Sequence, residues 1–207
     1  MIVSLGHTMA DYGTTAEVVD YAVERGATVT ATHLFNAMPS LHHRKPGAVA
    51  ALLATASAGR AVVEVIGDGV HLADGTVDLC AAAAGDNMVL VTDAMEATGM
   101  PDGSYVLGPL EVVVEGGVAR LATTDGTPGA IAGGTSTLAP QVTRFAARHG
   151  YTRAVRAASL RPGRLLGLDQ NEGLHVGNPA EFVVLDAAAH VSEVFAAGRR
   201  LTASETD

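Results

Sequence analysis

The chain has 207 residues, 48% of them hydrophobic, and a formal net charge of −9. A chain of this length and apolar content buries a sizeable core and is globular. Its negative charge argues against nucleic acid or an anionic membrane as a general partner, and no apolar run reaches the roughly 20 residues that span a bilayer. The single Cys80 and the lack of a signal-peptide pattern indicate a reducing compartment, so we expect a cytoplasmic protein.

Strand and helix patterns alternate through about the first 93 residues. Short runs of apolar and β-branched residues predict strands over 1–5, 28–35, 61–66 and 88–91. Between them, helices are expected from a capping box at Thr14 and Glu17 to Gly26, then over 48–57 and 77–84. Such an alternation is typical of βα repeats that pack around a parallel sheet, which places the chain in the α/β class.

Each of these strands carries, at or just beyond its carboxyl end, a polar residue that can titrate, namely His7, His33, His71 or Asp93. A lone histidine after a strand is more often structural than functional. However, the carboxyl ends of parallel strands meet on one face of a sheet or barrel, so these four side chains are expected to converge there.

A basic cluster follows the second strand. His42, His43, Arg44 and Lys45 precede a Pro-Gly pair that opens the helix at 48–57, where free backbone N–H groups accumulate. This arrangement predicts an anion site beside His33, and hence a phosphorylated or carboxylated small molecule as ligand.

The second part of the chain has a different texture. Antiparallel strands are expected over 104–107, 110–115 and 118–121, with a Gly-Gly hairpin turn between the last two, and a loop over 125–134. Helices are predicted over 138–149 and 152–160, followed by a short helix that begins at Arg161 and ends at Gly167. Strands over 181–185 and 191–195 come last, the latter turning at Gly198.

The residue types at the strand ends suit metal-assisted hydrolysis. Two imidazoles, from His7 and His33, are common ligands of a divalent transition metal. Asp93 could take a proton from a water that attacks a carbonyl, and return it to a leaving nitrogen. His71 could then hydrogen-bond the carbonyl oxygen.

Four segments with these residues resemble the N-acetylglucosamine-6-phosphate deacetylase family of the amidohydrolase superfamily. They are Thr-His-Leu-Phe-Asn-Ala-Met-Pro (32–39), Arg-Lys-Pro-Gly (44–47), Asp-Gly-Val-His (68–71) and Val-Thr-Asp-Ala (91–94). Segment 173–181 is similar to the superfamily's C-terminal signature. The resemblance implies a metal-dependent hydrolysis of the N-acetyl group of N-acetylglucosamine 6-phosphate, which gives glucosamine 6-phosphate and acetate.

The resemblance also implies site residues and a cofactor, a divalent cation such as Zn, Fe, Mn or Co. His7 and His33 correspond to metal ligands, and Asp93 corresponds to the catalytic acid/base. In the substrate site, Arg44 corresponds to a phosphate contact and His71 to the residue that binds the carbonyl. The other residues that correspond to substrate contacts are Asn36 and Ala37, together with Ile131, Ala132 and Gly133 in a loop that closes over the sugar.

The fold implied by the resemblance is the second half of a (β/α)8 amidohydrolase barrel plus the C-terminal part of a small β-sandwich. The expected parts are a half-barrel (1–100), a β-rich insertion with the substrate loop (101–135), the last barrel helices (136–168), and sandwich strands with a tail (169–207). A homodimer is implied as well.

The family's metal-binding glutamate on the third barrel strand has no counterpart in this sequence. Three accounts are open: a chain truncated relative to the natural protein, a chain completed by a second polypeptide, or a decayed remnant. Truncation or an incomplete reading frame is favoured because Met1 lies inside a predicted strand. Two functional alternatives also stand: another amide hydrolase of the superfamily, or a non-catalytic half-barrel that associates with a partner.

Overall fold

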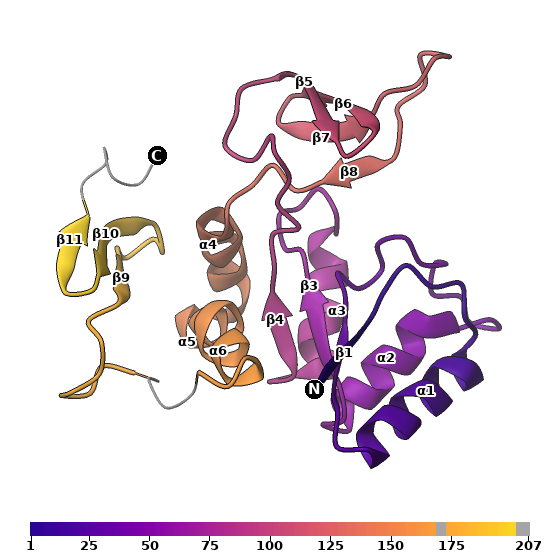
Figure 1. Ribbon diagram of the computed structural model, residues 1–207, viewed down its shortest axis with the longest axis horizontal. Helices are drawn as coiled ribbons and strands as arrows, with labels where there is room; N and C mark the ends of the chain where they lie inside the picture. The colour runs from indigo at the N-terminus through magenta and orange to yellow at the C-terminus, as the bar shows by residue number, and fades with distance from the viewer. Residues whose placement is uncertain (169–172, 202–207) are drawn as a thin grey trace.

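A four-stranded parallel sheet forms the first part of the protein (Figure 1). The structure, a computed structural model, describes residues 1–168 and 173–201. The sheet has the order β1-β2-β3-β4, in which successive strands are neighbours. The predicted alternation is confirmed, with β1 (Ile2–Leu5), α1 (Tyr12–Glu24), β2 (Thr28–Ala31), α2 (Gly47–Ser57), β3 (Val62–Val65), α3 (Asp74–Ala84) and β4 (Met88–Leu90).

The helices α1, α2 and α3 bury one face of this sheet. Alternate strand residues such as Val29, Val63 and Val65 point toward the helices and are fully or almost fully buried, as are Val19 of α1 and Leu52 of α2. Burying each such side chain stabilises the fold by about 1.5–3 kcal/mol. This shared core fixes the strands, and with them the positions of the residues that follow each strand.

Two local predictions in this part are wrong. The N-cap of α1 is Asp11, whose Oδ1 accepts the Thr14 N–H at 2.8 Å, so Thr14 lies inside the helix and forms no capping box with Glu17. These hydrogen bonds hold the pKa of Asp11 below its usual value. In addition, β2 ends at Ala31 because His33 and Phe35 take positive φ values, which a strand does not tolerate.

An antiparallel sheet follows, with the order β5-β6-β7-β8. Its predicted Gly-Gly turn is confirmed, since Gly116 and Gly117 have φ values of 58° and 73°, which suit the tight turn of a hairpin. The prediction of a loop over 125–134 is partly wrong, because its last residues pair with the preceding strand. The strands are β5 (Gly103–Leu107), β6 (Leu110–Glu115), β7 (Val118–Leu121) and β8 (Ile131–Gly133).

The helices of the second half pack beside β4 (Figure 1). They are α4 (Leu138–His149), α5 (Tyr151–Val155), the π-helix η1 (Arg156–Leu160) and α6 (Arg161–Leu165). Arginines of α4 and η1 pair with aspartates of α3 and the turn after it. Because exposed ion pairs contribute little to stability, these pairs orient the helices more than they stabilise them. They are Arg144–Asp74 at 2.7 Å, Arg148–Asp78, and Arg156–Asp86 at 3.5 Å.

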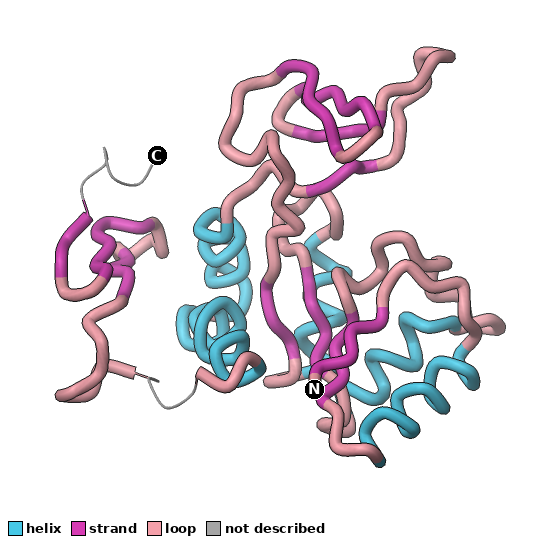
Figure 2. Tube along the Cα trace, viewed as in Figure 1, coloured by secondary structure: helices cyan, strands magenta, loops and turns pink. Residues whose placement is uncertain are grey.

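A three-stranded antiparallel sheet ends the described chain and confirms the predicted strands. It comprises β9 (Phe182–Leu185), β10 (Val191–Ala196) and β11 (Arg199–Leu201), which lie together as a separate group in Figure 2. Its turn between β9 and β10 contacts α4, where the Thr143 hydroxyl donates to the Ala189 carbonyl at 2.8 Å. Among the residues that the structure describes, no helix is long and apolar enough to cross a membrane.

One buried side chain links α4 to the first sheet. Gln141 is fully buried, and its Oε1 accepts the backbone N–H of Gly67 at 2.8 Å, just beyond the end of β3. This hydrogen bond joins residues 74 positions apart in the sequence.

We predict that Gln141→Leu lowers the free energy of unfolding by about 1–3 kcal/mol, because the Gly67 N–H would stay buried without an acceptor. Urea unfolding, followed by circular dichroism, measures the change. An unfolding free energy equal to that of the wild type would contradict the importance of this link.

Candidate active site

His7 and His33 come into direct contact beyond the ends of β1 and β2. The two strands are paired in parallel with Leu5 opposite Ala31. His7 lies two residues after Leu5, and His33 lies two residues after Ala31. As a result the two Nε2 atoms are 3.0 Å apart and the ring centroids 4.8 Å apart. His33 is buried, with 8% of its surface exposed, whereas His7 is exposed.

The chemistry of this pair suits a shared cation. In the absence of a cation, one Nε2–H donates to the other Nε2, and a metal ion can replace that shared proton because both nitrogens face the same point. The Nδ1 of His33 is buried and has no hydrogen-bond partner among the described residues. Within the same part of the chain, no third His, Cys, Asp or Glu joins the two histidines in a group that could hold a metal.

His71 lies in the turn after β3 and is held by Asp68. The Nδ1 of His71 is 2.7 Å from Oδ2 of Asp68, and the two side chains are only 4% and 6% exposed. Oδ1 of Asp68 accepts the backbone N–H groups of Val70 and His71. Burial raises the pKa of Asp68, but the hydrogen bonds from His71 and from the backbone outweigh it and leave this pKa below its usual value. From the sequence alone, Asp68 is indistinguishable from an ordinary turn residue.

A glycine and an arginine complete this turn. Gly69 has φ of 80°, and a Cβ placed there would lie 2.6 Å from the Cζ atom of Arg144. The Arg144 guanidinium is held in that position by Asp74. The turn that carries His71 is therefore packed against the ion pair between α3 and α4.

Asp93 follows β4 and lies against the segment that begins with β8. Its backbone carbonyl accepts the N–H of Gly134 at 2.7 Å, and Ala94 forms an isolated parallel bridge with the same glycine. The structure thus brings Asp93 next to the predicted substrate residues Ile131, Ala132 and Gly133, although these form a strand instead of a loop. The Asp93 residue is exposed and its φ is 51°.

The predicted substrate segment after His33 is tightly turned. Asn36 donates its side-chain N–H groups to the carbonyls of His33 (3.0 Å) and Leu34 (3.3 Å), so only its Oδ1 is left to meet a ligand. Ala37 is exposed with φ of 52°. The amide of Asn36 therefore stabilises the turn that presents His33.

The basic cluster lies where the sequence predicts it, directly before α2. His42 and Lys45 form an isolated bridge, and the backbone N–H of Arg44 donates to Nδ1 of His42 at 3.2 Å. Arg44 is exposed, and in the described parts of the chain no carboxylate pairs with its guanidinium. A cation in this setting is available to an anionic ligand.

All four predicted strand-end residues follow the carboxyl ends of their strands, but direct contact joins only His7 with His33. The structure brings Asp93 together with 131–134 and His71 together with Asp68, as two further groups. The structure thus places two contacting imidazoles, an oriented imidazole and an exposed carboxylate beyond the carboxyl ends of the strands of one sheet.

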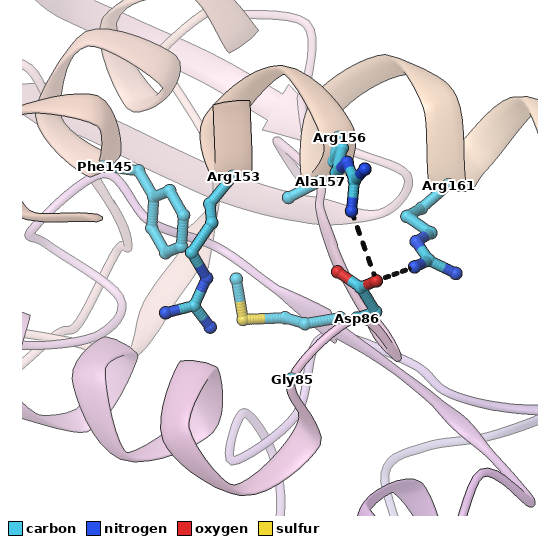
Figure 3. A pocket seen from close by; sticks show the side chains of 8 residues that line it. Gly85, Asp86, Phe145, Arg153, Arg156, Ala157 and Arg161 are labelled. Carbon is cyan, nitrogen blue, oxygen red and sulfur yellow. Dashed lines mark hydrogen bonds and ion pairs between the residues drawn. The ribbon is translucent and has the colours of Figure 1, made fainter. Parts of the chain in front are cut away.

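A second polar cluster lies at the opposite, amino-terminal end of β4 (Figure 3). Asp86 pairs there with Arg156 at 3.5 Å and with Arg161, while Arg153 donates to the carbonyl of Ala81 at 2.8 Å. These arginines hold the helices that follow α4 against the end of α3. The cluster is structural and separate from the residues at the carboxyl ends of the strands.

Comparisons with known proteins connect this geometry to a family, although no protein-family model matches the chain. The chain is 41% identical over 170 residues to a protein from Escherichia coli (strain K12) whose name assigns it provisionally to the N-acetylgalactosamine-6-phosphate deacetylases. That alignment covers 81% of this chain and 97% of the relative. This chain belongs to the N-acetylglucosamine-6-phosphate deacetylase family.

Longer members of the family show the same relationship. The N-acetylglucosamine-6-phosphate deacetylase of Bos taurus is 41% identical over 201 residues, which are 95% of this chain and 47% of that protein. The solved deacetylase of Mycobacterium smegmatis, a mutant in complex with N-acetyl-D-glucosamine-6-phosphate, is 39% identical with a TM-score of 0.84, over 97% of this chain and 51% of that one. This chain thus spans about half the length of these deacetylases.

We predict that Gly134→Ala disrupts the contact between Asp93 and the segment from β8. A Cβ at this position would lie 2.0 Å from the backbone carbonyl oxygen of Thr92, so the two segments would have to separate. Amide exchange measured by NMR should become faster at position 134, whose N–H bonds to the Asp93 carbonyl.

Gly75→Ala is the matched control, because Gly75 lies in α3 and a Cβ added there would have nothing within 4 Å. It should leave exchange at Gly134 unchanged, and it should stabilise the helix slightly. Equal exchange at position 134 in the wild type and in Gly134→Ala would contradict the close approach.

Proposed function

We propose that this chain forms one half of a metal-dependent deacetylase that hydrolyses the N-acetyl group of N-acetylglucosamine 6-phosphate to give glucosamine 6-phosphate and acetate. The observation that carries the proposal is the 3.0 Å contact between the Nε2 atoms of His7 and His33, at the carboxyl ends of neighbouring parallel strands, in a member of the deacetylase family. The substrate is proposed from the names of the relatives and from the basic cluster.

We propose that the four-stranded sheet is the second half of a (β/α)8 barrel. Its strands are all parallel, they follow one another in space as in sequence, and their helices pack on one face. A closed barrel has no edges, whereas β1 and β4 are edges here. About half of the Mycobacterium smegmatis chain lies outside the region covered, which is enough for the remaining strands.

The proposed parts of the chain follow from this view. Residues 1–100 would be the half-barrel, 101–135 the β-rich insertion with the substrate segment, and 136–168 the last barrel helices. Residues 169–207 would be the C-terminal part of a small β-sandwich, and 169–172 and 202–207 of this range lie outside the described residues. The sheet β9–β11 is the described part of that last unit.

His7 and His33 would hold a divalent cation through their Nε2 atoms, because those two nitrogens already face a common point. When bound, such a cation supplies Lewis acidity for the hydrolysis of an amide. Two imidazoles are fewer than the three protein ligands usual in a catalytic zinc site. The rest of the site would therefore come from the other half of the barrel, and the identity of the metal is left open among Zn, Fe, Mn and Co.

Asp93 would act as the acid/base of the reaction. An exposed carboxylate at the end of β4 is able to accept a proton from the attacking water and return it to the amine that leaves. His71, on the neighbouring strand end, would hydrogen-bond the acetyl carbonyl as negative charge develops on its oxygen. The segment Ile131–Gly133 would contact the sugar beside Asp93.

The phosphate would bind to the basic cluster before α2. Arg44 offers a planar guanidinium with no carboxylate partner in the described part of the chain, and the N-terminus of α2 adds backbone donors. Asn36 and Ala37 lie between His33 and this cluster in the sequence and would contact the sugar.

We also propose a homodimer and a cytoplasmic location. The latter is supported by a free, buried Cys80, whose pKa is raised by burial to about 12.

The reaction is tested by acetate release from N-acetylglucosamine 6-phosphate with added divalent metal. The chain is produced alone and together with the part of the Mycobacterium smegmatis deacetylase that it does not cover. We expect the assembled protein to release acetate, and Asp93→Asn to lower kcat by about 10²–10⁴-fold because the proton acceptor is lost.

Asp20→Asn is the control for this prediction, since it removes a carboxylate of α1 that pairs with Arg60, away from the strand ends. It should keep the kcat of the parent protein. Full activity of Asp93→Asn would overturn the assignment of the base. A folded, metal-loaded assembly that releases no acetate would overturn the proposed reaction.

The phosphate site is tested separately with Arg44→Ala. Loss of a charge-assisted contact should raise KM for the phosphorylated substrate by about 10–100-fold, with little change in kcat. The control is Arg60→Ala, because Arg60 pairs with Asp20 on α1, away from the strand ends. An unchanged KM for Arg44→Ala would favour another amide hydrolase of the superfamily, which needs no phosphate.

A further inference from the structure

We propose that Asp68 is a positioning residue that holds the proton of His71 on Nδ1, so that Nε2 is the nitrogen presented to the substrate. The consequence for catalysis rests on the proposed function, whereas the proton position belongs to the chain itself. The proposal starts from the contact between Oδ2 of Asp68 and Nδ1 of His71, which is 2.7 Å long.

The hydrogen bonds of this buried pair fix the direction of the donor. An ionised carboxylate only accepts hydrogen bonds, so the Nδ1 of His71 must carry a proton to bond with it. The hydrogen bonds to the Asp68 carboxylate keep the charged form favoured, as its lowered pKa shows. The side chains are 4% and 6% exposed, so water competes little for this contact.

A turn alone would not require a carboxylate at this position. Oδ1 of Asp68 already makes both turn contacts, with the N–H groups of Val70 (2.8 Å) and His71 (2.9 Å), and an asparagine could make the same contacts. The second oxygen, Oδ2, serves only the ring. The turn is also held independently, by Gln141 at Gly67 and by the Arg144 guanidinium packed over Gly69.

Fixing Nδ1–H determines what the other nitrogen can do. When the ring is neutral, Nε2 has a lone pair and accepts a hydrogen bond, for example from a sugar hydroxyl. When the ring is protonated, Nε2–H donates to a carbonyl oxygen, and the Asp68 carboxylate compensates the positive charge of the ring. Asp68 thus acts on the substrate through His71 and does not itself touch it.

The substitution Asp68→Asn separates the two oxygens by their roles. The single amide oxygen would keep the two turn contacts, and the amide N–H₂ would then face the ring. Because that group donates, Nδ1 of His71 would have to accept, and the ring proton would move to Nε2. We therefore expect the tautomer of His71 to invert while the turn is retained.

The tautomer is read by long-range ¹H–¹⁵N NMR of the histidine rings in the full chain, above the pH at which these rings are protonated. The His71 signals are assigned by their absence from the spectrum of His71→Gln. We expect a protonated Nδ1 in the wild type and a protonated Nε2 in Asp68→Asn. The control is Asp74→Asn, which removes the partner of Arg144 and should keep the wild-type tautomer.

A wild-type ring with its proton on Nε2 would overturn the proposal, and so would a tautomer that Asp68→Asn leaves unchanged. If Asp68→Asn does not fold, the wild-type tautomer alone decides. In an assembled, active deacetylase, Asp68→Asn should lower kcat by about 10–100-fold, because an amide does not compensate the positive charge of the protonated ring that donates to the carbonyl, and it should leave KM within about threefold. Inactive assemblies that nevertheless show the expected tautomers would refute the reaction and keep the role of Asp68.

Discussion

The parallel register of β1 and β2 is the constraint on which the candidate site depends. Leu5 lies opposite Ala31, and His7 and His33 each follow two residues later. Because side chains alternate between the faces of a strand, a slip of one residue would move one histidine relative to the other and separate their Nε2 atoms. The register is held by the apolar core beneath the sheet, so packing distant from the histidines determines whether they can share an ion.

The ends of the strands also carry backbone strain. His7, His33, Phe35, Ala37 and Asp93 have positive φ values without being glycine, and each follows the carboxyl end of β1, β2 or β4. Such conformations cost on the order of 1–3 kcal/mol each, and they persist where the surrounding structure requires them. They turn the chain out of the sheet, which explains why the strands are short. The core of α1, α2 and α3 offsets this cost.

Local sequence patterns contain part of the fold and part of the candidate site. Apolar runs such as 61–66 and the Gly-Gly hairpin turn indicate their elements directly, and the structure confirms them. The positions of the four strand-end residues could be predicted too, because parallel strands place their carboxyl ends together.

Contacts between residues distant in the sequence could not be predicted from local patterns. The strand β8 forms by pairing with the edge of β7, and the contact of Gly67 with Gln141 spans 74 residues. The role of Asp68 could not be predicted from the sequence either, since an aspartate before a glycine is typical of a turn. Only the contact of its second carboxylate oxygen with the ring of His71 distinguishes it.

Two buried side-chain nitrogens near the strand ends make no hydrogen bond within the described part of the chain. Nδ1 of His33 and Nε2 of Gln141 have no hydrogen-bond partner within residues 1–168 and 173–201. A buried donor without an acceptor costs about 1–3 kcal/mol, so a native protein usually supplies one. A metal-bound His33 in particular would need an acceptor for its Nδ1–H, which commonly orients such a ring. If His33 binds a metal ion as proposed, its Nδ1–H has no acceptor within residues 1–168 and 173–201.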